Sequence, residues 1–262
     1  MTFALLQDAV LRWYDANGRD LPWRRTRDPY AILVSEVMAQ QTQVSRVVAF
    51  YECWLARWPT PAALATARPA DVIAAWVGLG YNRRALRLRE AAIIVARDGW
   101  PADAAGLRTL PGVGPYTAAA VASLAFGERI AVVDTNVRRV ASRLHSDPGA
   151  LLPDDRHADW NQAAMELGAV HCSARAPRCG GCPAAVWCPS RDRVVTAPRG
   201  DRGPAERFED SDRWLRGRVI AGLASGTGLP PEIEPARMDR VLGALQRDGL
   251  LVRDGTSVAL PR

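Results

Sequence analysis

The sequence predicts an all-α protein that ends in a small module of a different kind. Apolar residues recur at helical spacing through most of residues 3 to 190, and alternating runs typical of strands are nearly absent there. Clusters of proline and glycine divide this stretch into separate helices. Residues 213–262 differ, because two helical stretches are followed by LLVR-DG-TSVAL, where Asp254-Gly255 suits a two-residue hairpin turn. We therefore expect a winged-helix-like module at this end.

Composition narrows the classes of partner and chemistry. The chain has 262 residues, 48% of them hydrophobic, which is enough for two modest domains. All 34 cationic side chains are arginine and the formal net charge is +6, which favours a polyanionic partner, although a genomic bias toward arginine explains the same count. Without lysine, no side chain can form a Schiff base. The N-terminus shows no signal-peptide pattern and no apolar run reaches membrane length, so we expect a cytoplasmic protein.

The first distinctive helix is expected to begin at Asp28-Pro29, a suitable N-cap followed by proline at the first helical position. Its apolar pattern predicts that it runs through Gln41 to Val44. Glu36 lies on the flank of the apolar stripe, where ionisation should be costlier than in water. That environment suits a general acid, but a solvated helix glutamate explains the same position.

A glycine-rich turn is expected in the middle of the chain. It connects a helix ending near Thr109 with a helix starting at Pro115, which is the pattern of a helix-hairpin-helix. Such a turn directs backbone N–H groups outward, where they can bind a DNA phosphate, although an ordinary helix–helix turn can look similar. The residues expected to contact the DNA backbone are Leu110, Gly112, Val113 and Gly114.

Asp134 is the second candidate catalytic carboxylate. It stands in the stretch VDTNVRRV, where we expect it to cap the following helix. Backbone N–H groups and the helix dipole stabilise the ionised form of such a residue, so it should be an anion at neutral pH. An anion suits an oxocarbenium-like sugar, and two carboxylates in opposed environments suggest an acid and its partner anion.

Four cysteines crowd into residues 172 to 188, with intervening gaps of six, two and five residues at Cys172, Cys179, Cys182 and Cys188. Zinc sites usually use two matched Cys-x-x-Cys pairs, and only one such pair occurs here. A single loop around a [4Fe–4S] cluster suits the unequal gaps better, with zinc and disulfides as the remaining alternatives. The fifth cysteine, Cys53, stands among Phe50, Tyr51, Trp54 and Leu55 and is expected to be a buried thiol.

The order of several motifs then identifies a family. The stretches LPWRRTRDPYAILVSEVMAQQTQV, GLGYNRRALRL, LPGVGPYTAAAV, VDTNVRRV, MELGA and the cysteine loop cover roughly residues 20 to 190. Their order resembles that of the MutY-type adenine DNA glycosylases of the endonuclease III superfamily. This resemblance implies a helix-hairpin-helix glycosylase fold with a cluster subdomain at 1–28 and 132–192 and a helical-barrel subdomain at 29–131. The charged stretch at 193–212, which contains proline and glycine, is expected to be a linker that leads to the module at 213–262.

The resemblance also implies residue roles. Glu36 would protonate the adenine leaving group, and Asp134 would stabilise the sugar cation or capture it covalently. Tyr116 and Asn136 would support these steps, and the cysteine loop would hold a [4Fe–4S] cluster. The substrate would be double-stranded DNA containing a mispaired base, bound by a monomer. Residues implied to bind the flipped base or the surrounding stack are Trp23, Arg24, Gln41, Tyr81, Asn82 and Glu166.

The chain differs from endonuclease III relatives at one site residue and departs from the MutY-type pattern at three places. Tyr116 stands where endonuclease III relatives have a lysine nucleophile, which predicts a monofunctional glycosylase. Asn82 replaces an aromatic residue that wedges beside the opposite base, and Ala39 replaces a leucine of the pocket wall. The chain is also too short for the NUDIX-like domain that reads 8-oxoguanine in relatives.

Two other functions remain open from the sequence. One is a mismatch glycosylase that removes thymine or uracil opposite guanine, although Glu36 favours purine removal, because an acid can protonate a purine ring nitrogen. The other is an iron–sulfur DNA-binding protein without catalysis. Arg83, Arg84 and Arg87 form either a phosphate-facing stripe or a solvated helix face.

Overall fold

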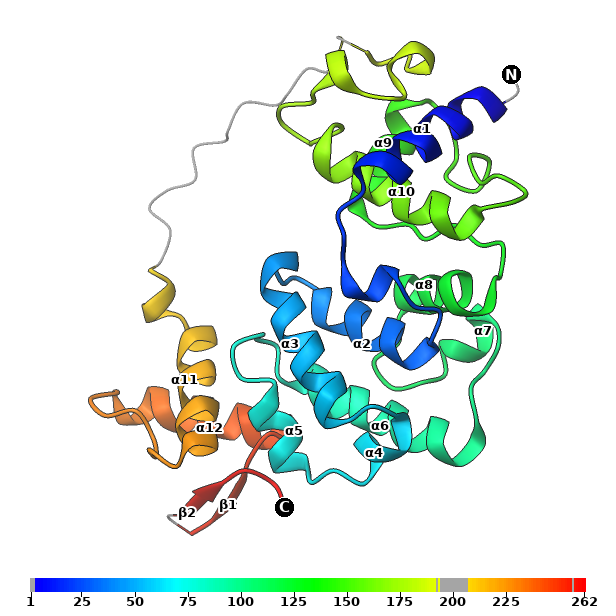
Figure 1. The fold of residues 1–262 in the computed structure, drawn as a ribbon. Coiled ribbons are helices and arrows are strands. Elements are labelled where there is room, and N and C mark those ends of the chain that lie inside the picture. The colour runs from blue at the N-terminus through cyan, green and yellow to red at the C-terminus, as the bar shows by residue number, and fades with distance from the viewer. Residues whose placement is uncertain (1–2, 192, 194–206, 256) are drawn as a thin grey trace. The chain divides into compact units, whose positions relative to one another are not determined.

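The computed structural model describes residues 3–191, 193, 207–255 and 257–262. The chain forms two compact units, each built from separate segments (Figure 1). Unit 1 contains residues 1–33, 101–109 and 113–200, and unit 2 contains residues 34–100, 110–112 and 201–262. Most of the expected linker at 193–212 lies outside the described residues. The domain boundaries expected from the sequence stay a prediction.

Unit 1 is built around one central helix. Helix α10 (His157–Val170) lies against α1 (Ala4–Asn17), α9 (Thr135–Arg143) and α8 (Pro115–Phe126), as the neighbouring ribbons of α1, α9 and α10 in Figure 1 illustrate. The short α7 (Ala104–Leu107) packs on α8, and three 3-10 turns cover Pro22–Arg24, Cys179–Gly181 and Ala185–Trp187. Apolar side chains from α1, α9 and α10 form the core, together with three cysteines of the loop: Leu6, Val10, Val140, Trp160, Ala163, Leu167, Cys172, Cys182 and Cys188.

Helix α2 (Pro29–Ala39) begins as predicted but ends earlier. Both carboxylate oxygens of Asp28 accept backbone N–H bonds, from Tyr30 at 3.2 Å and Ala31 at 3.1 Å, so Asp28 is the N-cap. The expected continuation through Gln41 to Val44 is wrong. The chain turns after Ala39, Gln41 adopts the left-handed conformation at φ 54°, and a new helix starts at Val44.

Unit 2 joins a helical layer from the middle of the chain to the C-terminal module. The first part has α3 (Val44–Arg57), α4 (Pro61–Ala65), α5 (Pro69–Ala75) and α6 (Arg83–Asp98), with α4 and α5 packed on α6. The module has a 3-10 turn (Phe208–Asp210), α11 (Asp212–Ser225) and α12 (Pro235–Arg247), and α11 packs on α5. One hydrophobic cluster fills both parts: Ile73, Val77, Leu86, Leu215, Val219, Ile220, Val241, Leu242, Leu245, Leu250 and Leu251.

The expected hairpin is present, one residue out of the predicted register. Strands β1 (Val252–Asp254) and β2 (Ser257–Ala259) are antiparallel, and Asp254 pairs with Ser257. The turn therefore starts after Asp254, at Gly255, whose φ of 57° is readily adopted by glycine. The two helices followed by this hairpin agree with a winged-helix-like module.

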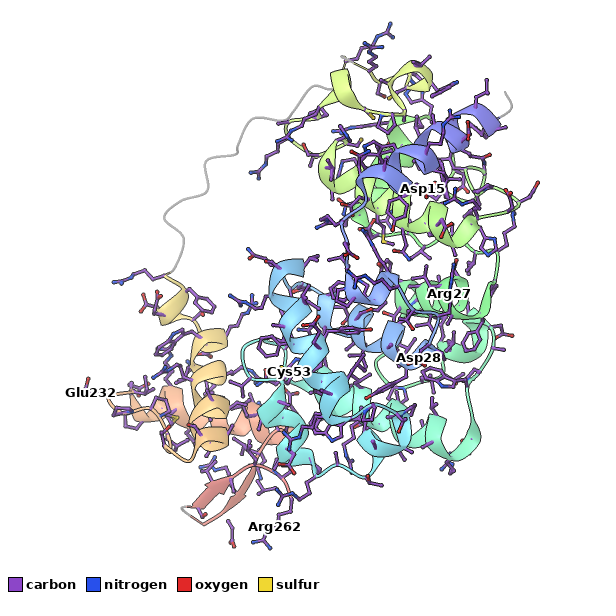
Figure 2. The ribbon with its side chains drawn as sticks, in the orientation of Figure 1. Asp15, Arg27, Asp28, Cys53, Glu232 and Arg262 are labelled. Carbon is purple, nitrogen blue, oxygen red and sulfur yellow. The ribbon has the colours of Figure 1, made fainter. Side chains whose placement is uncertain are left out.

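Cys53 corrects one expectation. In α3 the buried side chains are Val47, Tyr51 and Trp54, which follow helical spacing along one face. Cys53 precedes Trp54 and points to a different side, so its thiol is exposed rather than buried (Figure 2). The aromatic neighbours along the chain therefore did not indicate the local environment. No helix in the described part of the chain is both long and apolar enough to cross a membrane.

Candidate active site

Asp134 is the N-cap of α9, as predicted. Its Oδ1 accepts the backbone N–H of Val137 at 2.7 Å, and its Oδ2 accepts the side-chain amide of Asn136 at 3.0 Å. Both oxygens are thus oriented by donors that prefer a carboxylate. The structure brings Asp134 and Asn136 together within one turn of helix.

Asn136 is in turn fixed by Arg139, a residue that sequence reasoning did not select. The guanidinium of Arg139 donates to Asn136 Oδ1 at 2.7 Å, to the carbonyl of Gly168 at 2.7 Å and to the carbonyl of Cys172 at 2.6 Å. A continuous set of hydrogen bonds therefore connects the first cysteine of the loop to Asp134.

One turn of α10 collects three further site residues. Met165 Sδ accepts a hydrogen bond from the hydroxyl of Tyr116 at 3.3 Å. Gly168 lies so close to Asn136 that a Cβ added there would be 2.6 Å from Asn136 Cβ, so α9 and α10 can approach only with glycine at this position. The motif MELGA thus contributes to the packing of α9 on α10.

Glu166 on the same turn is fully buried and binds two arginines. Arg19 donates to its two oxygens at 2.7 and 2.9 Å, and Arg24 donates at 2.8 Å. Burial raises the pKa of Glu166, but the hydrogen bonds from Arg19 and Arg24 outweigh it and the pKa is lowered overall. Arg24 also lies over the ring of Tyr14, 5.3 Å from its centroid. Glu166 is therefore an anion that orients Arg24, beside the half-buried Trp23.

The hairpin residues have two different environments. Leu110 and Val113 are buried, so they hold the turn in place through their side chains. Gly112 and Gly114 are exposed, and Gly112 has a left-handed φ of 79°. A Cβ at Gly112 would also be 2.8 Å from Cβ of Arg87, so glycine is required there for two reasons. Gly114 caps α8, which places exposed backbone at a helix N-terminus.

Glu36 lies half-buried in a helix whose other side chains are nearly all buried. Val34, Ser35, Val37 and Met38 around it are each 5% exposed or less, which agrees with the expected place beside an apolar stripe. Asp134 and Glu36 belong to different units. Each carboxylate is therefore positioned by the residues of its own unit.

The turn after α2 presents Gln41. Gln41 is exposed and left-handed, a conformation that costs energy for a residue with a side chain. Arg84 stabilises this turn, because its guanidinium donates to the carbonyls of Val37 at 2.6 Å and Gln40 at 2.7 Å. It also donates to the carbonyls of Leu79 at 3.2 Å and Gly80 at 3.0 Å, so it connects two turns.

The second turn that Arg84 holds carries Tyr81 and Asn82. Tyr81 is 46% exposed and left-handed at φ 48°, and Asn82 precedes α6 without capping it through its side chain. The three arginines that follow do not form one stripe. Arg83 pairs with Asp248, Arg87 pairs with Glu90, and Arg84 is turned toward backbone carbonyls.

The four cysteines of the loop line one cavity, together with Arg143 and His171. Arg143 donates to the sulfur of Cys172 at 3.2 Å, which suits a thiolate. Burial raises the pKa of the Cys182 and Cys188 thiols, so a positively charged group is needed to keep them deprotonated. Among the described residues, no three His, Cys, Asp or Glu side chains form a group that could hold a metal ion. All four cysteines therefore line one cavity, beside an arginine whose charge can compensate that of a thiolate.

Comparison with known proteins decides the family. A family model described as HhH-GPD superfamily base excision DNA repair protein matches residues 34–161. An adenine DNA glycosylase from Mycobacterium tuberculosis is 43% identical over 272 residues, which cover 93% of this chain and 89% of the relative. The chain belongs to the adenine DNA glycosylase family. The MutY-type resemblance and the expected enzyme class are thereby confirmed.

Other members and solved structures agree with this assignment. The human adenine DNA glycosylase is 44% identical over 214 residues, which cover 71% of this chain and 39% of the relative. A thermostable thymine-DNA glycosylase superposes with a TM-score of 0.68 at 28% identity, covering 73% of this chain and 97% of that one. A non-covalent endonuclease III–DNA complex superposes with a TM-score of 0.61 at 22% identity, covering 74% of this chain and 98% of that one. This likeness shows the fold alone. The predicted all-α glycosylase fold is confirmed.

Proposed function

We propose that this family member is a monofunctional DNA glycosylase that flips and excises adenine mispaired with guanine or 8-oxoguanine. The reaction breaks the N-glycosidic bond and leaves an abasic site. The supporting observation is the Asp134–Asn136–Arg139 hydrogen-bond set, which presents an oriented carboxylate at a helix N-terminus in a chain of this family. The proposed setting is a cytoplasmic, nucleoid-associated monomer.

Glu36 is the proposed general acid. Its half-buried place in an apolar helix is a suitable environment for a carboxyl that must carry a proton to the leaving adenine. Protonation of a ring nitrogen converts the base into a neutral leaving group, so the bonding electrons can depart with it. The sugar then carries positive charge.

Asp134 is the proposed partner anion. Donors from Val137 and Asn136 fix its carboxylate, so it can stabilise the sugar cation or bond to it until water completes hydrolysis. Tyr116 and Asn136 support these steps by position. Because the chain contains no lysine, no side-chain amine follows with a strand-cleaving Schiff-base step.

Base flipping requires a pocket for the adenine and a side chain in the vacated stack. Trp23 and Arg24 are the proposed pocket residues. Glu166 has both oxygens engaged by arginines, so its proposed action is to orient Arg24 rather than to contact the base. Exposed Gln41 is the proposed stack-filling residue, and the hairpin at 110–114 is the proposed phosphate-binding element.

The proposed resident cofactor is a [4Fe–4S] cluster held by Cys172, Cys179, Cys182 and Cys188. The four cysteines share one cavity, and their unequal spacing suits a cluster loop. When bound, the cluster supplies a fixed shape to the loop, whose arginines then face the DNA backbone. No step of the proposed glycosylase reaction depends on its redox chemistry.

The decisive experiment incubates purified protein with duplexes containing A opposite G, A opposite 8-oxoguanine, T opposite G and U opposite G. Alkali then cleaves the abasic sites. We expect cleavage of the two adenine duplexes after alkali and none without it. Release of thymine or uracil instead would support the mismatch-glycosylase alternative, which the named thymine-DNA glycosylase neighbour makes the second candidate.

Glu36→Gln is the matched test of mechanism, because it keeps size and polarity but cannot donate the proton. Single-turnover adenine release should fall at least a hundredfold while duplex affinity is retained. Near-normal release by this variant would remove Glu36 from the mechanism. Loss of duplex binding by the variant alone would identify a folding defect instead.

A further inference from the structure

The C-terminal module places two exposed side chains beside the Tyr81 turn. The guanidinium carbon of Arg213, on α11, lies 4.7 Å from the centroid of the Tyr81 ring and 6.0 Å from that of Phe208. Tyr81 is 46% exposed and Phe208 is 56% exposed, so part of each side chain is accessible to solvent. These three residues form an exposed aromatic and cationic group, called here the Tyr81–Arg213–Phe208 surface.

The side of this surface that carries Tyr81 is held by Arg84. Its guanidinium lies 5.6 Å from the Tyr81 ring centroid and 5.4 Å from that of Trp76, and its hydrogen bonds fix the backbone just before Tyr81. The same guanidinium binds the carbonyl of Gln40. Tyr81 and Gln41, two exposed left-handed residues, are therefore positioned by one side chain.

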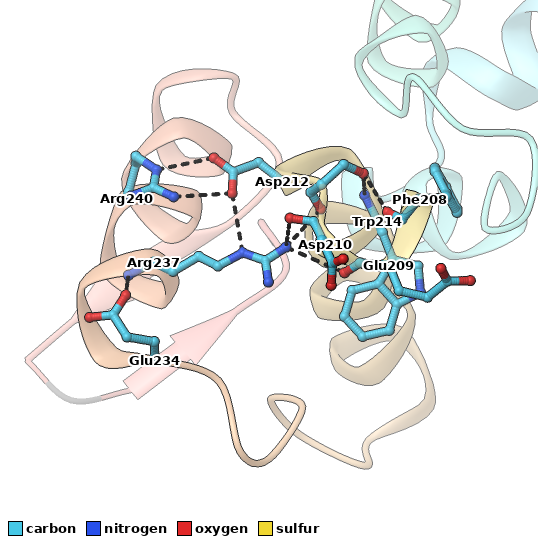
Figure 3. A network of polar contacts seen from close by, with 9 residues as sticks. Phe208, Glu209, Asp210, Asp212, Trp214, Glu234, Arg237 and Arg240 are labelled. Atoms are coloured by element: carbon cyan, nitrogen blue, oxygen red, sulfur yellow. Dashed lines mark hydrogen bonds and ion pairs between the residues drawn. The ribbon is translucent and has the colours of Figure 1, made fainter. Parts of the chain in front are cut away.

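The other side is held by the module's own ion network (Figure 3). Arg237 donates to the carbonyls of Asp210 at 2.7 Å and Ser211 at 2.9 Å, and to the carboxylate of Asp212 at 3.3 Å. Arg240 donates to both oxygens of the same carboxylate, at 3.0 and 3.2 Å. These contacts fix the turn that carries Phe208 and the start of α11.

A further ion pair ties α11 to the Tyr81 side. Asp248 accepts from Arg216 of α11 at 2.5 Å and from Arg83 of α6 at 3.4 Å. The buried cluster of Ile73, Leu215 and Val219 adds apolar contact between the two parts. The surface is thus fixed on both sides, although Tyr81 is far in the sequence from Phe208 and Arg213.

We propose that the Tyr81–Arg213–Phe208 surface binds the unpaired base that remains in the DNA when its partner is flipped out. The inference rests on the proposed function, because flipping is what leaves a base with an unpaired edge and an accessible face. Aromatic rings and guanidinium planes stack on such bases without reading their identity. The positive charge of Arg213 also suits the neighbouring phosphates. The C-terminal module then supplies aromatic contact that Asn82 cannot provide.

The test uses the full-length protein and a duplex in which 2-aminopurine lies opposite a stable tetrahydrofuran abasic analogue. Stacking on the surface should quench the 2-aminopurine fluorescence on binding. Arg213→Ala and Phe208→Leu should each lose most of that quench and bind this duplex about tenfold more weakly at fixed salt. Affinity for the same duplex with every base paired should change much less.

Arg218→Ala is the control, because Arg218 is an exposed arginine of the same helix that lies over Trp214 at 5.9 Å. It removes the same charge and should leave the quench intact. An equal loss of the quench in Arg218→Ala would overturn the proposal, and so would an equal loss of affinity for the fully paired duplex. Either result would mean that Arg213 contributes only its positive charge. A wild-type quench in both test variants would overturn it too.

The readout involves no base release. If the wild-type protein excises no adenine, the proposed function fails while the quench still reports on the surface. If adenine excision is normal and the variants behave as wild type, the surface assignment alone fails. Unchanged circular dichroism of each variant shows that it has folded.

Discussion

A charge inside the core of unit 1 is stabilised by its partners. Glu166 has no exposed surface, and Arg24 beside it is 13% exposed at the side chain, whereas Arg19 is 47% exposed. Removing one partner of such a group leaves the remaining charge without compensation, which costs more than the pair contributes. The sequence motif MELGA named the acid, but its two arginines come from residues 19 and 24 and no local spacing connects them to it.

Glu166→Gln should lower the free energy of unfolding by about 3 kcal/mol at pH 7, because Arg24 then stays in a buried place without its anion. Urea titration measures the change. Asp20→Asn is the control, since Asp20 pairs with Arg25 at the surface and its loss should leave the midpoint nearly unchanged. Equal midpoints for Glu166→Gln and the wild type would contradict the assignment.

The same carboxyl predicts a pH dependence. The pKa of Glu166 is lower in the folded chain than in the unfolded one, so its contribution is complete above the unfolded pKa of about 4.3. That contribution is lost as pH falls through the folded pKa. The stability difference between the wild type and Glu166→Gln should therefore shrink below pH 4, and a constant difference down to pH 3 would argue against this linkage.

At the scale of elements, local signals fixed where helices begin better than where they end. Asp28-Pro29 and Asp134 were both predicted as helix starts, because a cap acts on residues two or three positions away. The end of α2 was not predicted, since the apolar pattern continues past it. The turn depends on Arg84, which lies in another helix and is distant in the sequence.

Arg84→Lys should loosen the two turns without unfolding unit 2. A lysine keeps one charge but cannot reproduce donors that reach carbonyls of both turns. Amide hydrogen exchange should become faster at residues 40–43 and 79–82, and affinity for mispaired duplex should fall about fivefold, or 1 kcal/mol. Arg87→Lys, which alters an exposed ion pair with Glu90, is the matched control. Unchanged exchange in Arg84→Lys would contradict the role.

At the scale of the whole molecule, the fold was predictable and the assembly of its units was not. The order of the motifs indicated the glycosylase family, because the residues of each motif are close together in the sequence. The module packs on α5, which brings Ile73 into contact with apolar side chains between residues 215 and 251. No local sequence pattern connects these positions. The exposure of Cys53, the contact of Met165 with Tyr116 and that of Gly168 with Asn136 likewise depend on the three-dimensional arrangement, so they were not predictable from the sequence.

Loss of the proposed cluster should affect one unit more than the other. Cys172, Cys182 and Cys188 pack on the core of unit 1, so Cys182→Ser should remove iron and visible absorption and loosen that core. Hydrogen exchange should rise in α1, α9 and α10 while α5, α11 and α12 keep their protection. Val186→Ser, an exposed change in the same loop, serves as control. Full iron content in Cys182→Ser would contradict the ligand set.

The shared cluster of unit 2 has a consequence for synthesis of the protein. Ile73, Val77 and Leu86 leave the ribosome early, but the side chains that cover them belong to residues 215–251 and 258–260. Until those residues emerge, the nascent chain carries an uncovered apolar face. Delayed translation between residues 86 and 215 should therefore favour chaperone binding and aggregation, whereas a pause before residue 73 should be harmless.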